Sequence, residues 1–465
     1  MGAGVYLRSA SFSNDRKTRV DTRSHSTDSV HAASLRYAVS VKIYCSGIGG
    51  IGLSAYASHM RAAGHAVWGS DRAQSPTTRD LQEQGIQVLF NQDGSGLPKD
   101  IDLFVYSEAI PPDAPERREA EKRGIRMLSY FRALGELTAG TNLIAVCGTH
   151  GKSSTTAMAA KVLMDAGKDP NVVVGTKMRE LGGRNWRRGK TDLWVVEACE
   201  YRRSFHHLSP RTILLTNADG DHFDAFRDMA EYTQAFVEFL RKLPPSGVVI
   251  THGQVQGLRT LVTQAGRKLV DADTQPLTEL STPGLHMQQN AQLVLALGEL
   301  LGIPDTVTRS SLRNYSGVWR RMEMKGTLSS GVTVVDDYAH HPVEIRATLK
   351  AMRDAYPDRR IVCVFQPHTH DRTLKLWKEF SLSFSDADLV IIPNVYDARP
   401  DHDSERVSVP SLVQAIAEGS AVQCIDGISL PATETRLRKE LLKNGDVLVV
   451  MGAGNVTDLA TNMLQ

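Results

Sequence analysis

From residue 41 onward, short apolar runs alternate with turns and amphipathic stretches. The run Val41–Cys45 leads into the glycine-rich turn Gly47–Gly52, and the amphipathic stretch that follows ends at Gly64. Ala66–Trp68 and Asp102–Tyr106 have the apolar pattern of later strands. Strands that alternate with helices form a parallel sheet with helices on its faces. The first part of the chain is therefore expected to be an α/β domain.

The same pattern recurs twice more. Leu143–Cys147 is expected to be a strand, Gly148–Lys152 a turn and Thr155–Met164 part of a helix, whereas Pro276–Gly284 has the composition of a loop. The remaining apolar runs predict strands at Leu193–Glu197, Thr212–Thr216, Val332–Asp336, Ile361–Phe365, Leu389–Pro393 and Val447–Met451. The predicted fold class is α/β in three domains, with boundaries near residues 140 and 322.

Residues 1–40 differ from the rest of the chain. They are rich in Ser and Arg and contain no apolar segment of the kind found in a secretory signal. A disordered extension is the favoured interpretation. A transit-like presequence remains an alternative on composition.

Composition excludes several classes of protein. Hydrophobic residues make up 41% and charged residues 23%, and 54 basic against 52 acidic side chains give a net charge of +2, which provides no reason to expect nucleic acid as a partner. The apolar runs are far shorter than the roughly 20 residues that span a bilayer, so no membrane insertion is expected. The 5 cysteines are widely separated and form no CxxC pair. A reducing cytoplasm therefore fits best. The oligomeric state is not readable from these patterns.

The strongest local chemistry lies between a predicted strand and a predicted helix. Glycines there let the backbone wrap a phosphate, and the N–H groups at the start of the helix point their positive ends toward it. A lysine supplies charge for the outer phosphates of a nucleotide, and a serine hydroxyl can ligate Mg²⁺. These features predict an ATP-binding loop made of Gly148, Thr149, His150, Gly151, Lys152, Ser153 and Ser154.

Acidic and histidine side chains follow two of the predicted strands. Glu197 ends one strand, and Asp221 and His222 come after another. Because the carboxyl ends of parallel strands meet at one edge of the sheet, these groups are expected near the phosphate loop. Mg²⁺ bridging phosphates needs one or two protein carboxylates. The predicted metal site is therefore Ser153, Glu197 and His222.

A second glycine motif suggests a different chemistry. Gly47, Gly49 and Gly52 follow a strand, and Asp71 comes about 20 residues later, which matches the dinucleotide fingerprint. Alone it would favour an NAD-dependent dehydrogenase. A diphosphate at a helix N-terminus is what the motif binds, and a UDP-sugar carries one too, so hydride transfer is kept as the second interpretation of this domain.

Together these segments resemble the Mur ligases, over residues 41–465. The resemblance is carried by motifs in order along the chain: GIGGIG at Gly47–Gly52, GSD at Gly69–Asp71, GTHGKSS at Gly148–Ser154, TNxxxDH ending at His222, GVWRRME at Gly317–Glu323, DDYAHHP at Asp336–Pro342, FQPH at Phe365–His368 with Arg372, and GAGN at Gly452–Asn455.

The resemblance implies a domain order. Residues 41–140 would be a Rossmann-like UDP-substrate-binding domain, residues 141–322 a central P-loop ATPase with a mostly parallel sheet, and residues 323–465 a Rossmann-like amino-acid-binding domain. It also implies a reaction. With ATP and Mg²⁺, the muramoyl carboxylate of UDP-N-acetylmuramate would become an acyl phosphate, and L-alanine would displace phosphate to form an amide, in peptidoglycan precursor synthesis.

The family motifs also imply roles for individual residues. The expected catalytic residues are Lys152, Glu197, His222, His340 and Arg372. Around the nucleotide, the resemblance places Asn290 at the adenine and Arg321 and Asp337 at the phosphates and ribose. The expected alanine pocket consists of Tyr338, His340, His368 and Arg372. The expected UDP site consists of Gly47, Gly49, Gly50, Asp71 and Ser107.

Several of these residues have other interpretations. Tyr338, His340 and His341 could form a packed aromatic corner, although function is favoured. Of Arg320 and Arg321, only one need be functional. The basic loop that contains Arg184, Arg187, Arg188 and Lys190 is expected to be a solvated surface rather than a substrate grip.

The chain departs from the family pattern at a few positions. Cys199 and Asp219 replace larger carboxylates near the metal site, Thr369 replaces an arginine after FQPH, and Met287 interrupts the HNxxN motif. Cys199 and Asp219 are expected to alter the metal affinity without loss of activity, and Thr369 makes the selectivity for alanine over Gly or Ser an open question. The changes also allow a thiol at Cys199 or Cys147 to block ATP when modified, although inert buried cysteines are the favoured interpretation.

Two other functions remain open. One is a related ligase that attaches a whole peptide to UDP-muramate during cell-wall recycling. The other is a nucleotide-binding regulatory relative without strong catalysis, which the altered metal region suggests. The motifs FQPH with Arg372 and DDYAHHP favour L-alanine over a peptide as the substrate, and retention of the phosphate-facing residues argues against the regulatory relative.

Overall fold

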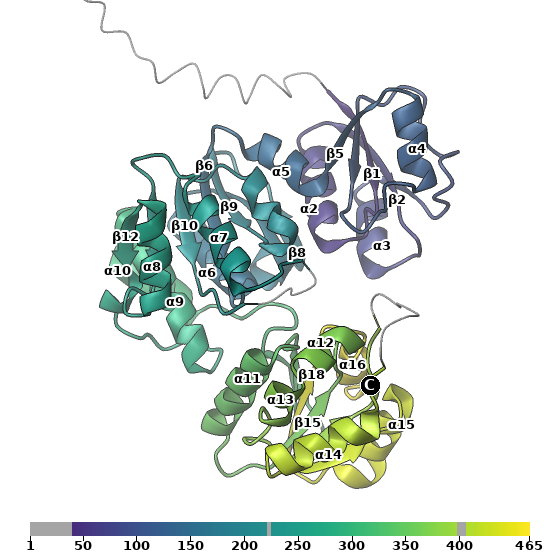
Figure 1. The fold of residues 1–465 in the computed structure, drawn as a ribbon, viewed down its shortest axis with the longest axis vertical. Helices are drawn as coiled ribbons and strands as arrows, with labels where there is room; N and C mark the ends of the chain where they lie inside the picture. The colour runs from purple at the N-terminus through teal and green to yellow at the C-terminus, as the bar shows by residue number, and fades with distance from the viewer. Residues whose placement is uncertain (1–39, 221–224, 398–405) are drawn as a thin grey trace, which may run out of the picture.

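The computed structural model describes residues 40–220, 225–397 and 406–465. The predictions for residues 1–39 and for Asp221 and His222 lie outside these residues. The described strands form three separate sheets, which build three lobes that follow one another along the chain (Figure 1). The predicted α/β class in three parts is confirmed.

The first sheet is parallel throughout, with strand order β3-β2-β1-β4-β5. Its strands are β1 (Lys42–Ser46), β2 (Ala66–Ser70), β3 (Gln87–Leu89), β4 (Leu103–Tyr106) and β5 (Arg126–Ser129). Its helices are α2 (Ile51–Ala62), α3 (Pro76–Glu83), α4 (Pro115–Lys122) and α5 (Tyr130–Thr138). Because the order reverses on either side of β1, the carboxyl ends of β1, β2 and β4 open a crevice at that edge.

The central sheet has the order β12-β11-β10-β6-β9-β7-β8, and only β8 runs antiparallel to its neighbour among these strands. Its strands are β6 (Asn142–Cys147), β7 (Asn171–Met178), β8 (Arg184–Arg187), β9 (Leu193–Glu197), β10 (Thr212–Leu215), β11 (Val248–Thr251) and β12 (Lys268–Asp271). Its helices are α6 (Lys152–Asp165), α7 (Met229–Leu240), α8 (Gln256–Ala265), α9 (Leu285–Leu300) and α10 (Asp305–Arg313).

The prediction of a basic surface loop around Arg184 was wrong in part. Arg184 and Arg187 lie in edge strand β8, and the Arg187 guanidinium pairs with Asp169. The charged sequence did not predict a strand, because an edge strand tolerates polar side chains on both faces and so lacks an apolar pattern. Arg188 and Lys190 follow the strand in a connecting segment.

The third sheet has the order β13-β14-β18-β15-β16-β17, with β13 antiparallel to β14 and the other pairs parallel. Its strands are β13 (Glu323–Thr327), β14 (Thr333–Asp337), β15 (Ile361–Phe365), β16 (Leu389–Ile392), β17 (Gln423–Asp426) and β18 (Val447–Met451). Its helices are α11 (Pro342–Ala355), α12 (His370–Lys375), α13 (Trp377–Ser381), α14 (Val409–Gly419), α15 (Leu430–Arg436) and α16 (Thr457–Asn462).

The central strands explain why continuous apolar runs predicted them well. All residues of β10, β11, β15 and β18 are buried, as expected for strands covered by helices on both faces. In the part of the chain that the structure describes, no helix combines the length and apolar character needed to cross a membrane.

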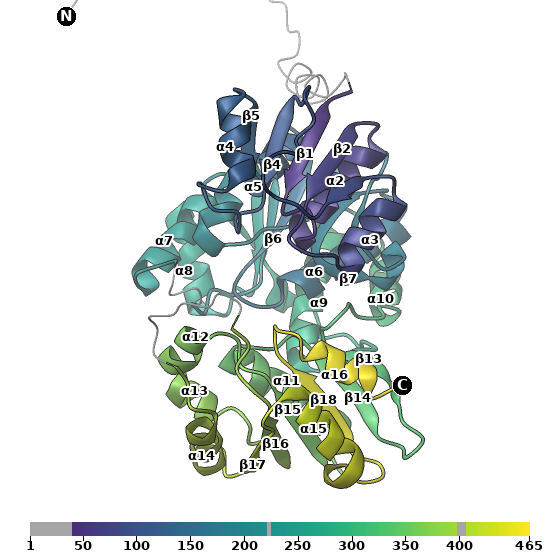
Figure 2. The ribbon, with the colours of Figure 1, turned by 90° about the vertical axis from the view of Figure 1, so that its right-hand side faces the viewer.

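Each outer lobe contacts the central lobe. Helix α2 packs on β7 and β8 of the central sheet, and its His59 ring lies 4.7 Å from the ring of Trp194 in β9. The third lobe contacts the second through Glu344, whose Oε1 lies 3.0 Å from Nδ1 of His150. Figure 2 shows the first lobe above the central one and the third below it. The central lobe therefore faces both neighbours.

Candidate functional site

The predicted phosphate loop connects β6 to α6 in a conformation that depends on glycine. Gly148 and Gly151 have φ of +136° and +79°. A Cβ on Gly148 would lie 2.1 Å from Thr216 Oγ1, and a Cβ on Gly151 would lie 2.7 Å from Asn290 Oδ1. Both positions therefore require glycine for conformation and for space.

Neighbouring segments hold the loop in place. The His150 N–H donates to Asn217 Oδ1 at 2.8 Å, and the Thr216 hydroxyl donates to the His150 carbonyl at 2.6 Å. The Thr149 hydroxyl lies 2.8 Å from the hydroxyl of Tyr232. Since Thr216 and Asn217 directly follow β10, the strand beside β6 clamps the loop from one side.

Lys152, the first residue of α6, is turned back onto its own loop. Its ammonium group donates to the carbonyls of Gly148 at 2.6 Å and Thr149 at 2.9 Å, and to Glu200 Oε1 at 3.0 Å. Burial alone would lower the pKa of Lys152, but the charge and hydrogen bond of Glu200 together with the nearby Glu197 and Cys199 outweigh burial and raise that pKa. The lysine is therefore charged at neutral pH and lies where phosphate oxygens would be bound.

Ser153 and Glu197 come together as predicted. The Ser153 hydroxyl donates to Glu197 Oε1 at 3.0 Å, and the backbone N–H of Gly175 donates to Glu197 Oε2 at 2.6 Å. A Cβ on Gly175 would lie 2.7 Å from either carboxylate oxygen. The carboxylate is thus oriented from behind by β7 and held against the hydroxyl that begins the helix.

These two oxygen donors suit a hard cation. Mg²⁺ takes oxygen ligands and usually keeps water and substrate phosphates in its shell, so a hydroxyl and one carboxylate are sufficient protein ligands. No cluster of three or more His, Cys, Asp or Glu side chains that could hold a metal by themselves occurs among the residues that the structure describes. The third predicted ligand, His222, lies outside them.

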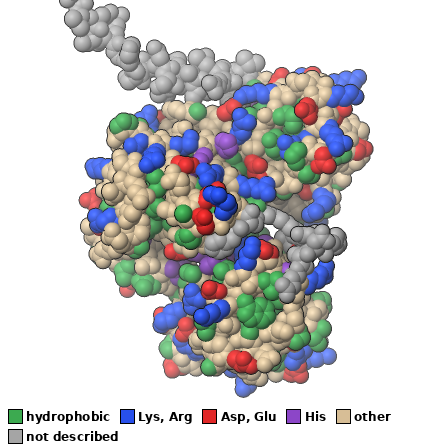
Figure 3. Space-filling model, viewed as in Figure 1, with side chains coloured by type: hydrophobic (Ala, Val, Ile, Leu, Met, Phe, Trp, Pro, Cys, Tyr) green, Lys and Arg blue, Asp and Glu red, His purple; other side chains and the backbone are tan. Residues whose placement is uncertain are grey.

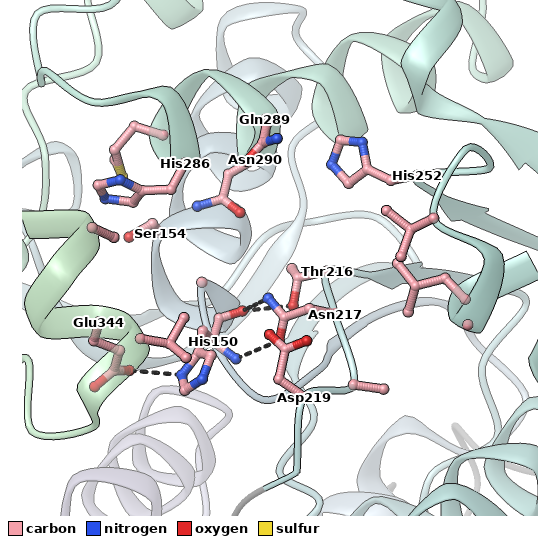
Figure 4. Close-up of a pocket in the computed structure, with 18 of the residues that line it drawn as sticks. His150, Ser154, Thr216, Asn217, Asp219, His252, His286, Gln289, Asn290 and Glu344 are labelled. Atoms are coloured by element: carbon pink, nitrogen blue, oxygen red, sulfur yellow. Dashed lines mark hydrogen bonds and ion pairs between the residues drawn. The ribbon is translucent and has the colours of Figure 1, made fainter. Parts of the chain in front are cut away.

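A cavity of about 680 Å³ opens beside the phosphate loop. It is lined by His150, Gly151 and Ser154 of the loop, by Asn290 of α9, and by groups of the C-terminal lobe. Figure 4 shows Asn290 and His286 on one wall, and His150, Asn217 and Asp219 on another. In the space-filling view, histidine side chains lie along the hollow between the C-terminal lobe and the rest (Figure 3). The cavity is large enough for a nucleotide.

Arg321 and Arg320 are neighbours with different surroundings. Arg321 lines the cavity, and its Nη1 lies 3.9 Å from Glu344 Oε1. Arg320 has φ of +55°, is buried, and donates to the carbonyl of Gly452. Both guanidinium groups lie close to the Tyr338 ring, at 5.0 Å for Arg320 and 4.8 Å for Arg321, but only Arg321 is in the cavity lining. Of the pair, Arg321 is therefore the residue that faces the site.

Asp337 is buried in the cavity wall with both oxygens engaged. It accepts from the N–H of Met322 at 2.6 Å and of Ala339 at 2.7 Å. Burial raises the pKa of Asp337 to about 6 from 3.8, although Arg321 and the two N–H donors act in the opposite direction. The carboxyl therefore remains partly protonated in mildly acidic solution.

This raised pKa predicts a pH dependence of stability. Between the unfolded and folded pKa values, the folded protein binds a proton that the unfolded chain has released, so the free energy of unfolding falls as the pH rises through this window and stays lowered above it. Asp337→Asn removes this titration. We expect wild-type stability relative to the variant to fall by about 2 kcal/mol between about pH 4 and about pH 7 in chemical denaturation. A difference that is constant with pH would contradict the assignment.

The glycine turn of the first lobe is built around the end of β2. The N–H groups of Gly47 and Ile48 both donate to the Ser70 carbonyl at 2.9 Å. Gly47 has φ of +79°, and a Cβ there would lie 3.0 Å from that of Ser107. The predicted residues Gly47 and Ser107 are therefore in direct proximity at the crevice of this sheet.

Asp71 and the next glycines complete that turn. The Gly49 N–H donates to Asp71 Oδ2 at 2.7 Å, and a Cβ on Gly49 would lie 2.8 Å from the same oxygen. Gly50 is the residue before α2. All five residues predicted for the UDP site thus lie at the carboxyl edge of the first sheet.

The four residues predicted for the alanine pocket also meet. Tyr338 and His340 follow β14, whereas His368 and Arg372 follow β15, and β18 lies between these two strands. The His340 ring lies 5.3 Å from that of Tyr338 and 5.8 Å from that of His368. Arg372 Nη1 is 3.5 Å from His368 Nδ1. The four side chains form a half-buried polar cluster with one guanidinium at its side.

The positions that depart from the family pattern have structural explanations. Burial raises the pKa of Cys199 to about 12, and it also raises that of Cys147. Both thiols are therefore protonated and weakly nucleophilic near neutral pH, which supports the interpretation of inert cysteines. Met287 is buried in the core, and Thr369 adopts φ of +68° with its N–H bonded to the Tyr396 carbonyl at 2.9 Å.

Sequence reasoning missed two carboxylates. Glu200 binds Lys152, and Glu344 contacts both His150 and Arg321. Glu344 comes three residues after His341, with Pro342 between them, which is typical of a helix start, so its capping role could have been found. Its contact with His150 joins residues 194 apart and leaves no local signal.

Comparison with protein-family models places all three lobes in one family. Residues 42–141 match the model of the Mur ligase family, catalytic domain, residues 146–274 the Mur ligase middle domain, and residues 320–454 the Mur ligase, glutamate ligase domain. The fold and site define a three-domain nucleotide-binding protein with a phosphate loop in its middle domain. The chain belongs to the Mur ligase family.

Individual relatives agree with this placement. A UDP-N-acetylmuramate–L-alanine ligase of Clostridium novyi is 35% identical over 89% of this chain and 95% of its own length. One of Sulfurihydrogenibium is 34% identical over 91% and 97%. Among solved structures, the UDP-N-acetylmuramate-alanine ligase of Thermotoga maritima has a TM-score of 0.75 at 26% identity, covering 91% of this chain and 98% of its own. A murein peptide ligase of Psychrobacter arcticus, at 23% identity and a TM-score of 0.67, shares the fold.

Proposed function

We propose that this protein uses ATP to join L-alanine to the muramoyl carboxylate of UDP-N-acetylmuramate, in the cytoplasm. The observation that carries the proposal is the phosphate loop with Lys152. This loop opens into a cavity whose lining also includes Arg321 and, from the third domain, Asp337. Relatives that match nearly the whole chain carry the name of this ligase. A carboxylate is inert toward amines until it acquires a leaving group, which explains the need for ATP.

The nucleotide would lie along this cavity. Its phosphates would meet the N–H groups at the start of α6 and the ammonium of Lys152, which would exchange its bonds to loop carbonyls for phosphate oxygens. The adenine would lie near Asn290 and the ribose near Asp337. Burial lowers the pKa of His286 to about 4, so this neighbour is neutral and does not repel a base.

Mg²⁺ would be held by Ser153 and Glu197, with His222 as the third expected ligand. Bound to the phosphates, the ion would neutralise charge on the transferring group. The remaining stabilisation of the transition state would come from the protein's own side chains. Lys152 would stabilise the charge that develops on the phosphoryl oxygens, since a preorganised ammonium in a partly dry site acts more strongly than one in water.

The chemistry proceeds in two displacements. A carboxylate oxygen of the muramoyl group attacks the γ-phosphorus and ADP leaves, which forms an acyl phosphate. The neutral amine of L-alanine then attacks the carbonyl carbon, a tetrahedral intermediate forms, and inorganic phosphate departs as the amine loses its proton. Both steps require the acid, the nucleotide and the amine to be held in line, so catalysis is mainly positional and electrostatic.

The two substrates would enter from opposite lobes. The diphosphate of UDP-N-acetylmuramate would meet the glycine turn at Gly47–Gly50, and the amino acid would lie among Tyr338, His340, His368 and Arg372. Arg372 would bind the carboxylate of alanine, since a guanidinium matches that group in charge and shape. The rings of Tyr338 and His340, 5.3 Å apart, would lie beside the bound amino acid.

Phosphate release with a panel of amine substrates tests the function. With UDP-N-acetylmuramate, ATP and Mg²⁺, we expect L-alanine to support turnover at least about 10-fold better than Gly or L-Ser, since one small group is worth roughly 1–3 kcal/mol in a pocket. A tripeptide is expected to support none. Turnover with the tripeptide but not with alanine would identify a peptide ligase. Absence of turnover with every amine would favour a regulatory nucleotide-binding protein.

A further inference from the structure

Glu344 occupies the first turn of α11 at the boundary between the central and C-terminal lobes. Its carboxylate accepts from the N–H groups of His340 at 3.1 Å and His341 at 3.3 Å, and so completes a capping box at the start of that helix. Its side chain is 14% exposed. A cap alone would need one oxygen on the solvent side of a helix, so the second oxygen and the burial need another explanation.

The two carboxylate oxygens face different lobes. Oε1 lies 3.0 Å from Nδ1 of His150 in the phosphate loop and 3.9 Å from Nη1 of Arg321 in the cavity. Oε2 faces the C-terminal lobe, where it lies 3.3 Å from Nδ1 of His340 in addition to the two N–H groups. Figure 4 shows Glu344 extending from its helix toward His150 at one side of the cavity.

From Glu344 the contacts continue to the proposed alanine pocket. His340 Nδ1 also lies 3.0 Å from the carbonyl oxygen of Tyr338, and the His340 ring packs edge-on against His368. His368 is in turn next to Arg372. An uninterrupted row of side chains therefore leads from the phosphate loop to the residue proposed to hold the amino-acid carboxylate.

The carboxylate in the middle of this row is ionised. Burial alone would raise the pKa of Glu344, but His340 and His150 outweigh that effect, and the pKa is held well below its usual value. A charged acceptor makes shorter and stronger hydrogen bonds than a neutral one. The orientation of both histidines is therefore tied to this one group.

We propose that Glu344 is a positioning residue that couples occupation of the phosphate loop to the shape of the amino-acid pocket, through His150 on one side and His340 on the other. The inference rests on the proposed function. Nucleotide in the loop fixes the backbone around His150, which holds Glu344 and hence His340 in one arrangement. Alanine then binds to a pocket that is already ordered, so nucleotide and amino acid strengthen each other's binding.

Two substitutions of Glu344 can distinguish its contact with His150 from its role as the cap of α11. Gln has one acceptor oxygen, and its amide would turn N–H groups toward the N–H groups of His340 and His341. Asp keeps the charge and still caps the helix, but it is one methylene shorter and cannot reach the helix start and His150 together. Glu344→Asp therefore breaks the contact between lobes while it keeps the cap.

The experiment is calorimetric binding of L-alanine at saturating UDP-N-acetylmuramate, with and without a non-hydrolysable ATP analogue and Mg²⁺. We expect the analogue to tighten alanine binding by about 10-fold or more in the wild type, within the usual range of coupling between sites, and by less than about 3-fold in Glu344→Asp and Glu344→Gln. Without the analogue, Glu344→Asp should bind alanine as the wild type does. Asp354→Asn, which removes an exposed carboxylate from the same helix, should keep the full coupling.

Each outcome of this experiment supports or overturns the coupling role of Glu344. Wild-type coupling in Glu344→Asp, or no coupling in the wild type, overturns the inference while the proposed function stands on its phosphate release. Equal weakening of alanine binding by Glu344→Asp with and without the analogue also overturns it, because that is the effect of a damaged helix start alone. Wild-type protein that binds no alanine under either condition overturns the proposed function as well.

Discussion

Replacement of Lys152 by Ala is expected to reduce alanine-dependent phosphate release by about 10³-fold, the cost of losing one preorganised group that faces a developing charge. The ammonium lies against the carbonyls of Gly148 and Thr149, at the point where phosphate oxygens would enter. Phosphate release in the presence of UDP-N-acetylmuramate, ATP, Mg²⁺ and L-alanine measures the effect. Equal rates in variant and wild type would exclude the proposed role of the loop.

The same substitution should also lower stability. Glu200 is fully buried, and its carboxylate would lose the ammonium that lies 3.0 Å away. Removing one partner of a buried ion pair costs roughly 3–5 kcal/mol, whereas replacing both partners with neutral groups costs little. Lys152→Met combined with Glu200→Gln should therefore recover stability without activity. Lys161→Ala removes another lysine of the same helix, one that pairs with Asp165. This control should change neither the stability nor the phosphate-release activity by much.

Gly148→Ala is expected to abolish ATP binding. The added Cβ would lie 2.1 Å from Thr216 Oγ1 and within 2.9 Å of backbone atoms of Asn217, and the residue has φ of +136°. Thr216 and Asn217 follow β10, so they can make room for the added Cβ only if the end of that strand moves away from the loop. Titration with a fluorescent ATP analogue measures the loss, and circular dichroism verifies that the variant folds.

Gly167→Ala is the matched control for that substitution. Gly167 also has a positive φ, +69°, but an added Cβ would meet no heavy atom within 4 Å. Its cost is limited to the left-handed conformation, about 1–2 kcal/mol, and ATP should bind as in the wild type. Equal ATP affinity in both variants would mean that the loop tolerates displacement and does not wrap the phosphates tightly.

Local patterns predicted the parts of the site that lie within one βα unit. The strand, glycine turn and helix around Lys152 were placed from sequence because apolar runs, left-handed glycines and a helix start are properties of neighbouring residues. The same holds for the turn at Gly47–Gly50. The roles of individual residues rest on the resemblance to a family and stay predictions until substitution tests them.

Contacts between distant segments were not predictable in this way. Nothing near Glu200 indicates that it would bind Lys152, which lies 48 residues earlier. Strand β8 escaped notice because an edge strand carries charges, and its pairing with β7 depends on the partner strand rather than on its own pattern. Arg320 and Arg321 have the same side chain, and only the folded structure shows that Arg321 lines the cavity whereas Arg320 is buried.

By itself the sequence determined that this chain forms three α/β units, where the phosphate loop lies, and which residue types gather at strand ends, because these follow from the order of apolar, glycine and polar positions along one segment. Only the tertiary structure decided which side chain of the C-terminal lobe meets the loop. Glu344 and His150 approach to 3.0 Å because two lobes pack together, and packing depends on the shapes of whole surfaces that no single segment contains.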